Sequence, residues 1–242
     1  MFLFPNIELP SSQHYHISKI MDIIIALKPF SVLDVGTGFG KYGVLCREYL
    51  ELWDGRTEYE FIRRIDGVEA FENYITPLHK FIYNNIYIEN IIDLVKKLDY
   101  KYDLVLLIDV LEHFSKEEGV WLLNNLLSKN KGILISTPKK PSAQKDVFDN
   151  VFETHKSLWK KEELISFGKY YFSPDNVSYI VYITKEQRSL DNLHMILKAL
   201  KMARHESLIL RLTSKKRSII KSIKRKLSSI PLMVKVYRKF KK

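Results

Sequence analysis

Three glycines alternate along one short segment of the chain, directly after an apolar run that contains an acid. The segment reads Val32-Leu33-Asp34-Val35-Gly36-Thr37-Gly38-Phe39-Gly40. Glycine tolerates positive φ angles and lets a ligand approach the backbone closely, so this pattern after a strand is typical of a ligand-binding turn. The segment predicts a small-molecule site, and its candidate residues are Asp34, Gly36, Thr37, Gly38 and Gly40. We call residues 36–40 the glycine loop.

The same region also fits the fingerprint of dinucleotide-binding proteins, because residues 38–43 read Gly-Phe-Gly-Lys-Tyr-Gly. In that fingerprint the first glycine directly follows the strand, and the helix N-terminus receives a pyrophosphate. Here Gly36 and Gly38 already form the turn, and Asp34 lies at the end of the strand. A carboxylate at that place suits a ligand with an ammonium group better than a diphosphate, which disfavours a nicotinamide or flavin enzyme.

Further acids lie at the ends of later strands. Glu69 ends the second predicted strand, where a carboxylate can accept hydrogen bonds from two adjacent sugar hydroxyls. Asp66, earlier in the same strand, is the weaker competitor for this role. Asp93 follows the third strand, where a helix N-cap explains it nearly as well. Asp109 ends the fourth strand, beside the glycine loop.

The glycine loop resembles the first motif of the class I S-adenosylmethionine-dependent methyltransferases, Asp-x-Gly-x-Gly-x-Gly, and the resemblance extends over about residues 31–184. It implies S-adenosylmethionine as the cofactor. Asp34 and the glycine loop would then hold the methionine end, and Glu69 the ribose. Asp93 would bind the adenine amino group, and Asp93 and Asp109 together would flank the adenine and methionine ends.

Two histidines are the candidate catalytic residues. Residues 109–114 read Asp-Val-Leu-Glu-His-Phe, which resembles a segment of many small-molecule methyltransferases. Methyl transfer to a hydroxyl needs a base, and His113, with an ordinary pKa of about 6.5, is of the right type. His155 lies after the fifth strand and is the second candidate, with Phe152 and Trp159 nearby. Packing explains each of these side chains equally well.

Glu112, His113 and His155 are also residue types that bind divalent metals, as in some RNA 3′-end methyltransferases of this fold. Two adjacent residues on one turn rarely both face one ion, so the sequence predicts no metal.

Cys46 is the single cysteine. It excludes an intrachain disulfide and a cysteine-based zinc site, and it disfavours a mechanism of pyrimidine methylation that uses a cysteine nucleophile.

Short β-rich runs alternate with helical stretches, which predicts an α/β protein with a Rossmann-like, doubly wound, seven-stranded, mostly parallel sheet. The turn Pro174-Asp175-Asn176 is too short for a helical crossover, so the last strand is predicted to be antiparallel. A helix over residues 17–27 is expected as a lid on the cofactor. The predicted strands cover residues 31–35, 64–68, 86–89, 102–108, 132–136, 170–173 and 177–184.

The net charge of +11 is uneven. Bases concentrate from Lys198 onward, where Glu206 is the one acid, and the preceding residues carry a small excess of acids. The expected parts are an N-terminal lid or helix (1–30), a methyltransferase domain (31–190) and a basic helical C-terminal extension (191–242). The pattern of residues 215–230 predicts a basic amphipathic helix. Packing of this helix on the domain, or its contact with an anionic membrane, is favoured over binding to nucleic acid.

The resulting expectation is methyl transfer to a small-molecule or glycan-type acceptor, at oxygen. An RNA methyltransferase that uses the basic extension, and a non-catalytic binding module that keeps the fold, are the alternatives. Pro5 and Pro10 interrupt an N-terminus without a basic leader, which predicts a cytoplasmic protein, peripheral to the inner membrane if the extension binds lipid. The sequence predicts no oligomeric state.

Overall fold

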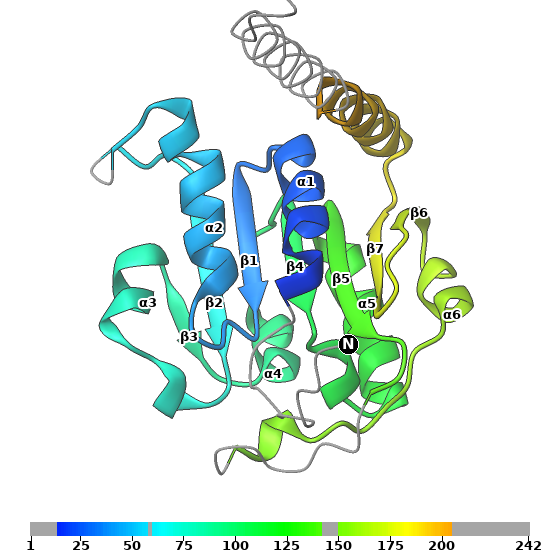
Figure 1. The fold of residues 1–242 in the computed structure, drawn as a ribbon. Coiled ribbons are helices and arrows are strands. Elements are labelled where there is room, and N and C mark those ends of the chain that lie inside the picture. The colour runs from blue at the N-terminus through cyan, green and yellow to red at the C-terminus, as the bar shows by residue number, and fades with distance from the viewer. Residues whose placement is uncertain (1–13, 58–59, 142–149, 205–242) are drawn as a thin grey trace, which may run out of the picture. The chain divides into compact units, whose positions relative to one another are not determined.

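The computed structural model describes residues 14–57, 60–141 and 150–204. A seven-stranded sheet in the order β3-β2-β1-β4-β5-β7-β6 forms the centre of the first of two units, Met1–His194 (Figure 1). Strands β1 to β5 are parallel, and β7 is antiparallel to both β5 and β6. The strands are Ser31–Val35 (β1), Arg64–Glu69 (β2), Ile86–Ile88 (β3), Leu104–Ile108 (β4), Gly132–Pro138 (β5), Lys169–Ser173 (β6) and Ser178–Thr184 (β7). The predicted fold class is confirmed.

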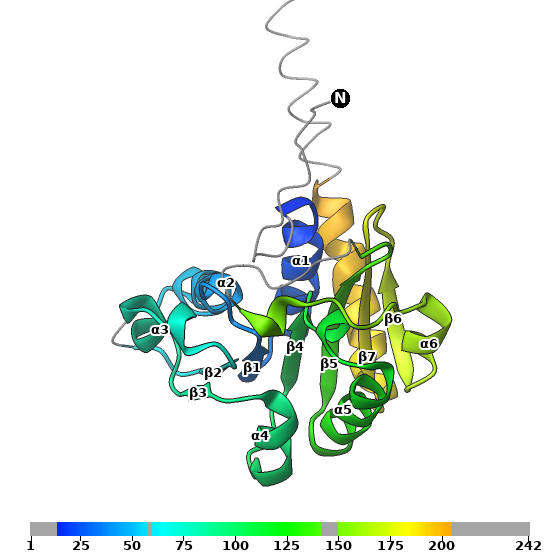
Figure 2. The ribbon, with the colours of Figure 1, turned by 90° about the horizontal axis from the view of Figure 1, so that it is seen from below.

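Helices cover both faces of the sheet. Figure 2 shows α1 to α3 on one face, α4 and α5 on the other, and α6 beside β6. The bounds are Ile17–Leu27 (α1), Lys41–Leu50 (α2), Pro77–Ile82 (α3), Ile91–Lys97 (α4), Lys116–Lys129 (α5) and Lys161–Ile165 (α6). Short 3-10 turns cover His14–His16 (η1), Leu52–Asp54 (η2), Glu72–Tyr74 (η3), Leu111–His113 (η4) and Val151–Glu153 (η5).

The two central strands explain why the sheet is covered on both sides. All residues of β1 and of β4 are buried, as expected for parallel strands between two layers of helices. From β1 the chain adds β2 and β3 on one side, and it then crosses back to place β4 on the other side of β1. The order in which strands are added to the sheet thus reverses between β1 and β4. In open α/β folds, ligands bind at the carboxyl ends of the strands where such a reversal occurs.

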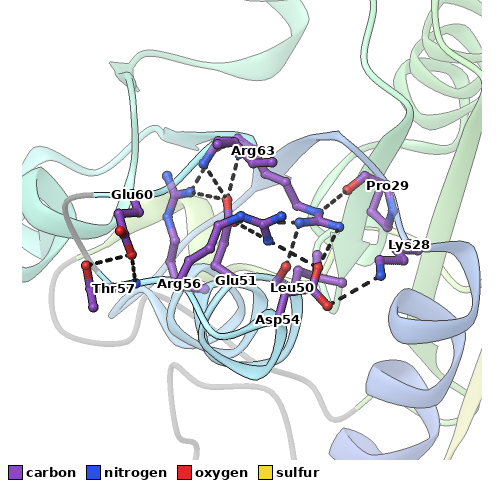
Figure 3. Close-up of polar contacts among 11 residues, drawn as sticks. Lys28, Pro29, Leu50, Glu51, Asp54, Arg56, Thr57, Glu60 and Arg63 are labelled. Carbon is purple, nitrogen blue, oxygen red and sulfur yellow. Dashed lines mark hydrogen bonds and ion pairs between the residues drawn. The ribbon is translucent and has the colours of Figure 1, made fainter.

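A buried polar network lies between the end of α2 and the start of β2 (Figure 3). The Glu51 carboxylate is fully buried and accepts hydrogen bonds from the backbone N–H groups of Ile62 and Arg63, at 3.1 and 2.6 Å. The Arg63 guanidinium donates to the carbonyl of Leu50 at 2.6 Å. These bonds join the end of α2 to the start of β2, whose register then sets Val68 opposite Val35.

The second unit is Met195–Lys242, of which the structure describes residues 195–204, and these are helical. The predicted basic amphipathic helix at residues 215–230 lies outside the described residues. Within the described part of the chain, none of the helices combines the length and the apolar content needed to cross a bilayer.

Candidate cofactor and acceptor site

The glycine loop adopts a conformation that requires glycine at three positions. Gly36, Gly38 and Gly40 have φ angles of 68°, 51° and 82°, in the region that other residues rarely adopt. The backbone N–H groups of Gly36 and Thr37 donate to the carbonyl of Val68, at 2.8 and 3.2 Å. The loop thus bends across the end of β2 before α2 begins at residue 41.

Glu69 is the acid that contacts this loop. Its Oε2 atom accepts a hydrogen bond from the backbone N–H of Gly38 at 2.9 Å, and Oε1 accepts one from Phe71 at 3.0 Å. Burial raises the pKa of Glu69 against the lowering effect of these bonds. Asp66, the competitor, is fully buried in the core, where it accepts from Tyr102 Oη at 2.6 Å. The structure therefore leaves Glu69 as the carboxylate at the edge of the sheet.

Asp34 lies beneath the loop and is 3% exposed. Its Oδ2 atom accepts a hydrogen bond from the Tyr83 hydroxyl at 2.6 Å. Burial raises the pKa of Asp34 to about 7, against the lowering effect of the Tyr83 hydrogen bond, and the charge of Glu69 raises it further. The contact with Tyr83 positions the carboxylate, and its binding of a cofactor ammonium group stays a prediction.

His79 is a site residue that the sequence did not reveal. Its ring is fully buried, and Nε2 lies 2.8 Å from the carbonyl oxygen of Gly38. Because Nδ1 accepts the backbone N–H of Thr76 at 3.1 Å, the proton is on Nε2, which donates to Gly38. The one local signal was the start of a helix at Thr76-Pro77, and nothing in it pointed to the glycine loop.

The first helix brings a buried histidine to the end of β4. His16 precedes α1, is fully buried, and its Nε2 lies 3.6 Å from Oδ2 of Asp109. Asp109 has a φ of 54°, rare for a residue other than glycine, and accepts from the Ser136 hydroxyl at 2.8 Å. In the described part of the chain, the ring nitrogens of His16 and the Thr37 hydroxyl lack hydrogen-bond partners. Buried polar atoms without partners fit a site that a polar ligand completes.

Asp93 lies apart from these groups. Its side chain is 67% exposed and pairs with Lys96 at 2.8 Å, and Asn90 caps α4 instead, by accepting from the N–H of Ile92 at 2.9 Å. The alternative role of Asp93 as an N-cap is therefore wrong, and its contact with adenine stays a prediction.

A hollow of about 370 Å³ beside α4 contains none of the predicted site residues; it is lined by Tyr87, Glu89, Leu94, Lys97, Leu98, Asp99 and Tyr100.

The acceptor side is formed where the segment after β5 returns to the turn after β4. The N–H groups of Lys156 and Ser157 donate to the carbonyl of Glu112, at 2.8 and 3.1 Å. This brings the rings of His113 and His155 together, with centroids 5.0 Å apart. Burial, and secondarily His155, lower the pKa of His113 to about 4. The two candidate catalytic histidines therefore lie side by side.

Glu112 is a third polar group at this place. It is 1% exposed, and Oε2 accepts the Thr137 hydroxyl at 2.9 Å. Burial raises the pKa of Glu112 well above its ordinary value, and the charge of Asp109 raises it further. One potential ligand atom each from Glu112, His113 and His155 lies within 4.8 Å of the others.

Aromatic residues near the site divide into two groups. Trp159 is 1% exposed in the core, and an added Cβ on Gly119 would lie 2.5 Å from its ring, so Trp159 packs α5. Phe39, in the glycine loop, is 55% exposed and its ring centroid lies 5.3 Å from that of Tyr74. Phe71 contacts the same ring at 5.0 Å. These three rings form an apolar wall beside Glu69.

The structure is similar to solved structures that include an O-methyltransferase family protein and a domain with S-adenosylhomocysteine bound. An O-methyltransferase family protein from Burkholderia thailandensis has a TM-score of 0.52 and 13% identity over 70% of this chain, and the match spans 55% of that protein's length. The N-terminal domain of EvdMO1 has TM-scores of 0.54 with S-adenosylhomocysteine (SAH) bound and 0.53 in the presence of SAH and D-fucose. These matches have 14 and 15% identity and cover 72 and 73% of this chain and 83 and 85% of that domain.

No protein-family model matches the sequence, and a search of curated proteins gives no significant match. At identities of 13 to 15%, structural likeness establishes the fold. The chain thus has the Rossmann-like fold of S-adenosylmethionine-dependent methyltransferases, with the seven-stranded order and the antiparallel β7 described above.

Proposed function

We propose that this protein is an S-adenosylmethionine-dependent methyltransferase that acts on a hydroxyl of a small-molecule or glycan-type acceptor. One observation carries the proposal. A loop of three positive-φ glycines is joined by a hydrogen bond to the acid at the end of the neighbouring strand, at the carboxyl edge of a methyltransferase-like sheet. A dinucleotide fingerprint would instead need its first glycine directly after β1, whereas the pattern here begins at Gly38, three residues after the strand ends at Val35.

The described residues fit this cofactor. Glu69 has two carboxylate oxygens at the sheet edge, which suit the ribose hydroxyls, and the aromatic wall of Phe39, Phe71 and Tyr74 suits the adenine ring. Thr37 and His16 supply buried polar atoms without partners for the methionine end, beside Asp109. We retain Asp34, Gly36, Gly38 and Gly40 in the site, and Asp93 as the predicted adenine contact.

When bound, the cofactor supplies an electrophilic methyl group; the acceptor oxygen forms the new bond to carbon while the C–S electron pair returns to sulfur. The hydroxyl proton must leave, and His113 and His155 are the candidate bases. Burial lowers the pKa of His113 to about 4, so this histidine is neutral at physiological pH but is a weaker base than an ordinary histidine. EvdMO1 was crystallised with D-fucose, and a sugar hydroxyl is an acceptor of the proposed class.

The test begins with binding and continues with turnover. Calorimetry of the full chain with SAH should show one saturable site, and incubation with radiolabelled S-adenosylmethionine and a panel of sugars and small hydroxyl compounds should label one of them. Substituting His113→Ala or His155→Ala should slow the transfer by about 100-fold if that histidine is the base. Absence of SAH binding would refute the proposal and favour a non-catalytic module.

For the basic extension we keep the proposal of contact with an anionic membrane surface, which would place a cytoplasmic enzyme at the inner membrane. Flotation with liposomes containing anionic lipid, compared with RNA retention at several salt concentrations, tests it. Binding to RNA that is lost on deletion of residues 215–242 would favour the RNA methyltransferase instead.

A further inference from the structure

Glu112, His113 and His155 come from two segments that the sheet brings together. The first two lie in η4, directly after β4, and His155 follows η5, after β5. The hydrogen bonds of Lys156 and Ser157 to the Glu112 carbonyl fix one segment against the other. The cluster is therefore set by backbone contacts and does not depend on long, mobile side chains.

The charge around Glu112 is unfavourable for a buried carboxylate. Two acids, Asp109 and Glu153, act on it unfavourably, and its own backbone N–H and the Thr137 hydroxyl are the donors that oppose them. Among the residues that the structure describes, no ion pair includes Glu112, and the Thr137 hydroxyl is the side-chain donor to it. A buried carboxylate is costly unless a cation or several donors compensate it. A cation at this place would supply the missing charge.

The neighbouring backbone prepares His113 as a ligand. Its Nδ1 atom lies 3.3 Å from the carbonyl oxygen of Thr154. A proton on Nδ1 that points to this oxygen leaves the lone pair of Nε2 available, and metal-binding histidines are commonly oriented by such a second contact. Thr137 orients Glu112 in the same way, because its hydroxyl donates a hydrogen bond to Oε2 at 2.9 Å.

We propose that Glu112, His113 and His155 form a binding site for one divalent transition-metal ion, such as Zn²⁺, Mn²⁺ or Fe²⁺. Two imidazoles and one carboxylate favour these ions over Mg²⁺, which prefers oxygen ligands throughout. The candidate ligand atoms lie within 4.8 Å of one another, and neighbouring ligands of a tetrahedral ion lie about 3.4 Å apart, so the side chains must approach one another by up to about 1.4 Å to bind it. Adjacent residues on one turn rarely both face one ion, but here the potential ligand atoms of Glu112 and His113 both lie within 4.8 Å of that of His155.

The position of this ion would bear on the reaction, and this step rests on the proposed function. Three protein ligands leave coordination positions open for an acceptor hydroxyl beside the cofactor. A bound cation lowers the pKa of a coordinated hydroxyl, which favours the alkoxide that attacks the methyl group. With an ion bound, the two histidines would be ligands in place of the bases suggested above, and water would accept the hydroxyl proton.

Metal binding can be measured without any turnover. The full chain, treated with chelator and dialysed, is titrated with Co²⁺ by visible absorption, and Zn²⁺ is added as a competitor. One Co²⁺ per chain should bind, with absorption bands that indicate nitrogen and oxygen ligands, and Zn²⁺ should displace it. Glu112→Gln and His155→Ala should each weaken binding by about 100-fold, because each removes a ligand. His194→Ala, a histidine outside the cluster, should not change it.

Absence of saturable Co²⁺ binding, or equal binding by Glu112→Gln, His155→Ala and the unsubstituted chain, would overturn the proposal. Should Glu112→Gln fail to fold, as judged by circular dichroism, the partly exposed His155 provides the deciding variant. SAH binding is measured in parallel on the same samples. If the chain binds Co²⁺ at the cluster but does not bind SAH, the metal site is supported and the methyltransferase proposal is refuted. If it binds SAH but not Co²⁺, the metal site is refuted and the methyltransferase proposal stands.

Discussion

The backbone N–H of Gly38 donates a hydrogen bond to the Glu69 carboxylate at 2.9 Å. This bond links the middle of the glycine loop to the end of β2, the neighbour of β1 in the sheet. On the other side of the loop, His79 Nε2 donates to the Gly38 carbonyl at 2.8 Å. The peptide groups of the loop are thus held from both sides in a conformation that glycine alone adopts without strain.

Replacing Glu69 with glutamine should weaken SAH binding. The amide keeps one acceptor but turns an N–H₂ group toward Gly38 or Phe71, where two N–H donors now point at one another. We expect a loss of about tenfold in affinity, or about 1.4 kcal/mol, measured by calorimetry. Glu89→Gln, which alters an acid paired with Lys97 away from the loop, is the control and should leave affinity unchanged. Equal losses in both variants would contradict the assignment.

Two glycine substitutions separate backbone strain from steric clash. An added Cβ on Gly36 would lie 2.6 Å from Val110 Cγ2 at a φ of 68°, whereas one on Gly55 meets no heavy atom within 4 Å at a φ of 82°. Gly55→Ala should lower the free energy of unfolding by about 1 kcal/mol, from strain alone. Gly36→Ala should lower it by about 3 kcal/mol, because the clash adds to the strain. Urea unfolding measures both; equal losses would mean that Val110 moves aside freely.

The Asp34 carboxyl should make stability depend on pH. Burial raises its pKa from 3.8 to about 7, so the folded state holds the proton more tightly than the unfolded state. Its contribution is fully present below pH 3.8 and is lost as the pH rises toward 7. Tyr83, the Gly43 backbone and Glu69 face the carboxyl, and Cys46 lies nearby.

Asp34→Asn removes this titration while keeping an acceptor for Tyr83. The free energy of unfolding of the variant, relative to the unsubstituted chain, should therefore increase between pH 4 and 8. Urea unfolding at a series of pH values measures the difference. A constant difference across this range would show that Asp34 is ionised in the folded protein throughout.

His79 should act on the cofactor through the glycine loop and not by direct contact. His79→Ala removes the donor to Gly38 and should raise the KM for S-adenosylmethionine about tenfold, with kcat little changed. His79→Gln can still donate to the carbonyl and should restore part of the affinity. If both variants lower the apparent kcat and leave KM unchanged, the loss is of folded protein and His79 has no positioning role.

The sequence by itself determined the helices and strands and the conformation of the glycine loop. The strand bounds of β1 and the bounds of α1 agree with the structure residue for residue, and the glycines occupy positive φ angles as their spacing predicted. These features are local, because backbone conformation and alternation of apolar residues are properties of a few consecutive residues. The antiparallel last strand was likewise encoded in one short turn, and it is confirmed.

Tertiary structure decided which side chains meet. Asp66 and Glu69 are both acids of β2. The hydroxyl of Tyr102, which lies just before β4, donates a hydrogen bond to Asp66 in the core, whereas Glu69 accepts one from Gly38 in the glycine loop. His79 reaches Gly38, and His155 reaches His113, across long stretches of chain. Contacts of this kind depend on how helices and loops pack on the sheet, which no local pattern specifies. The cluster of Glu112, His113 and His155, on which the proposed metal site rests, is therefore recognised only in the tertiary structure.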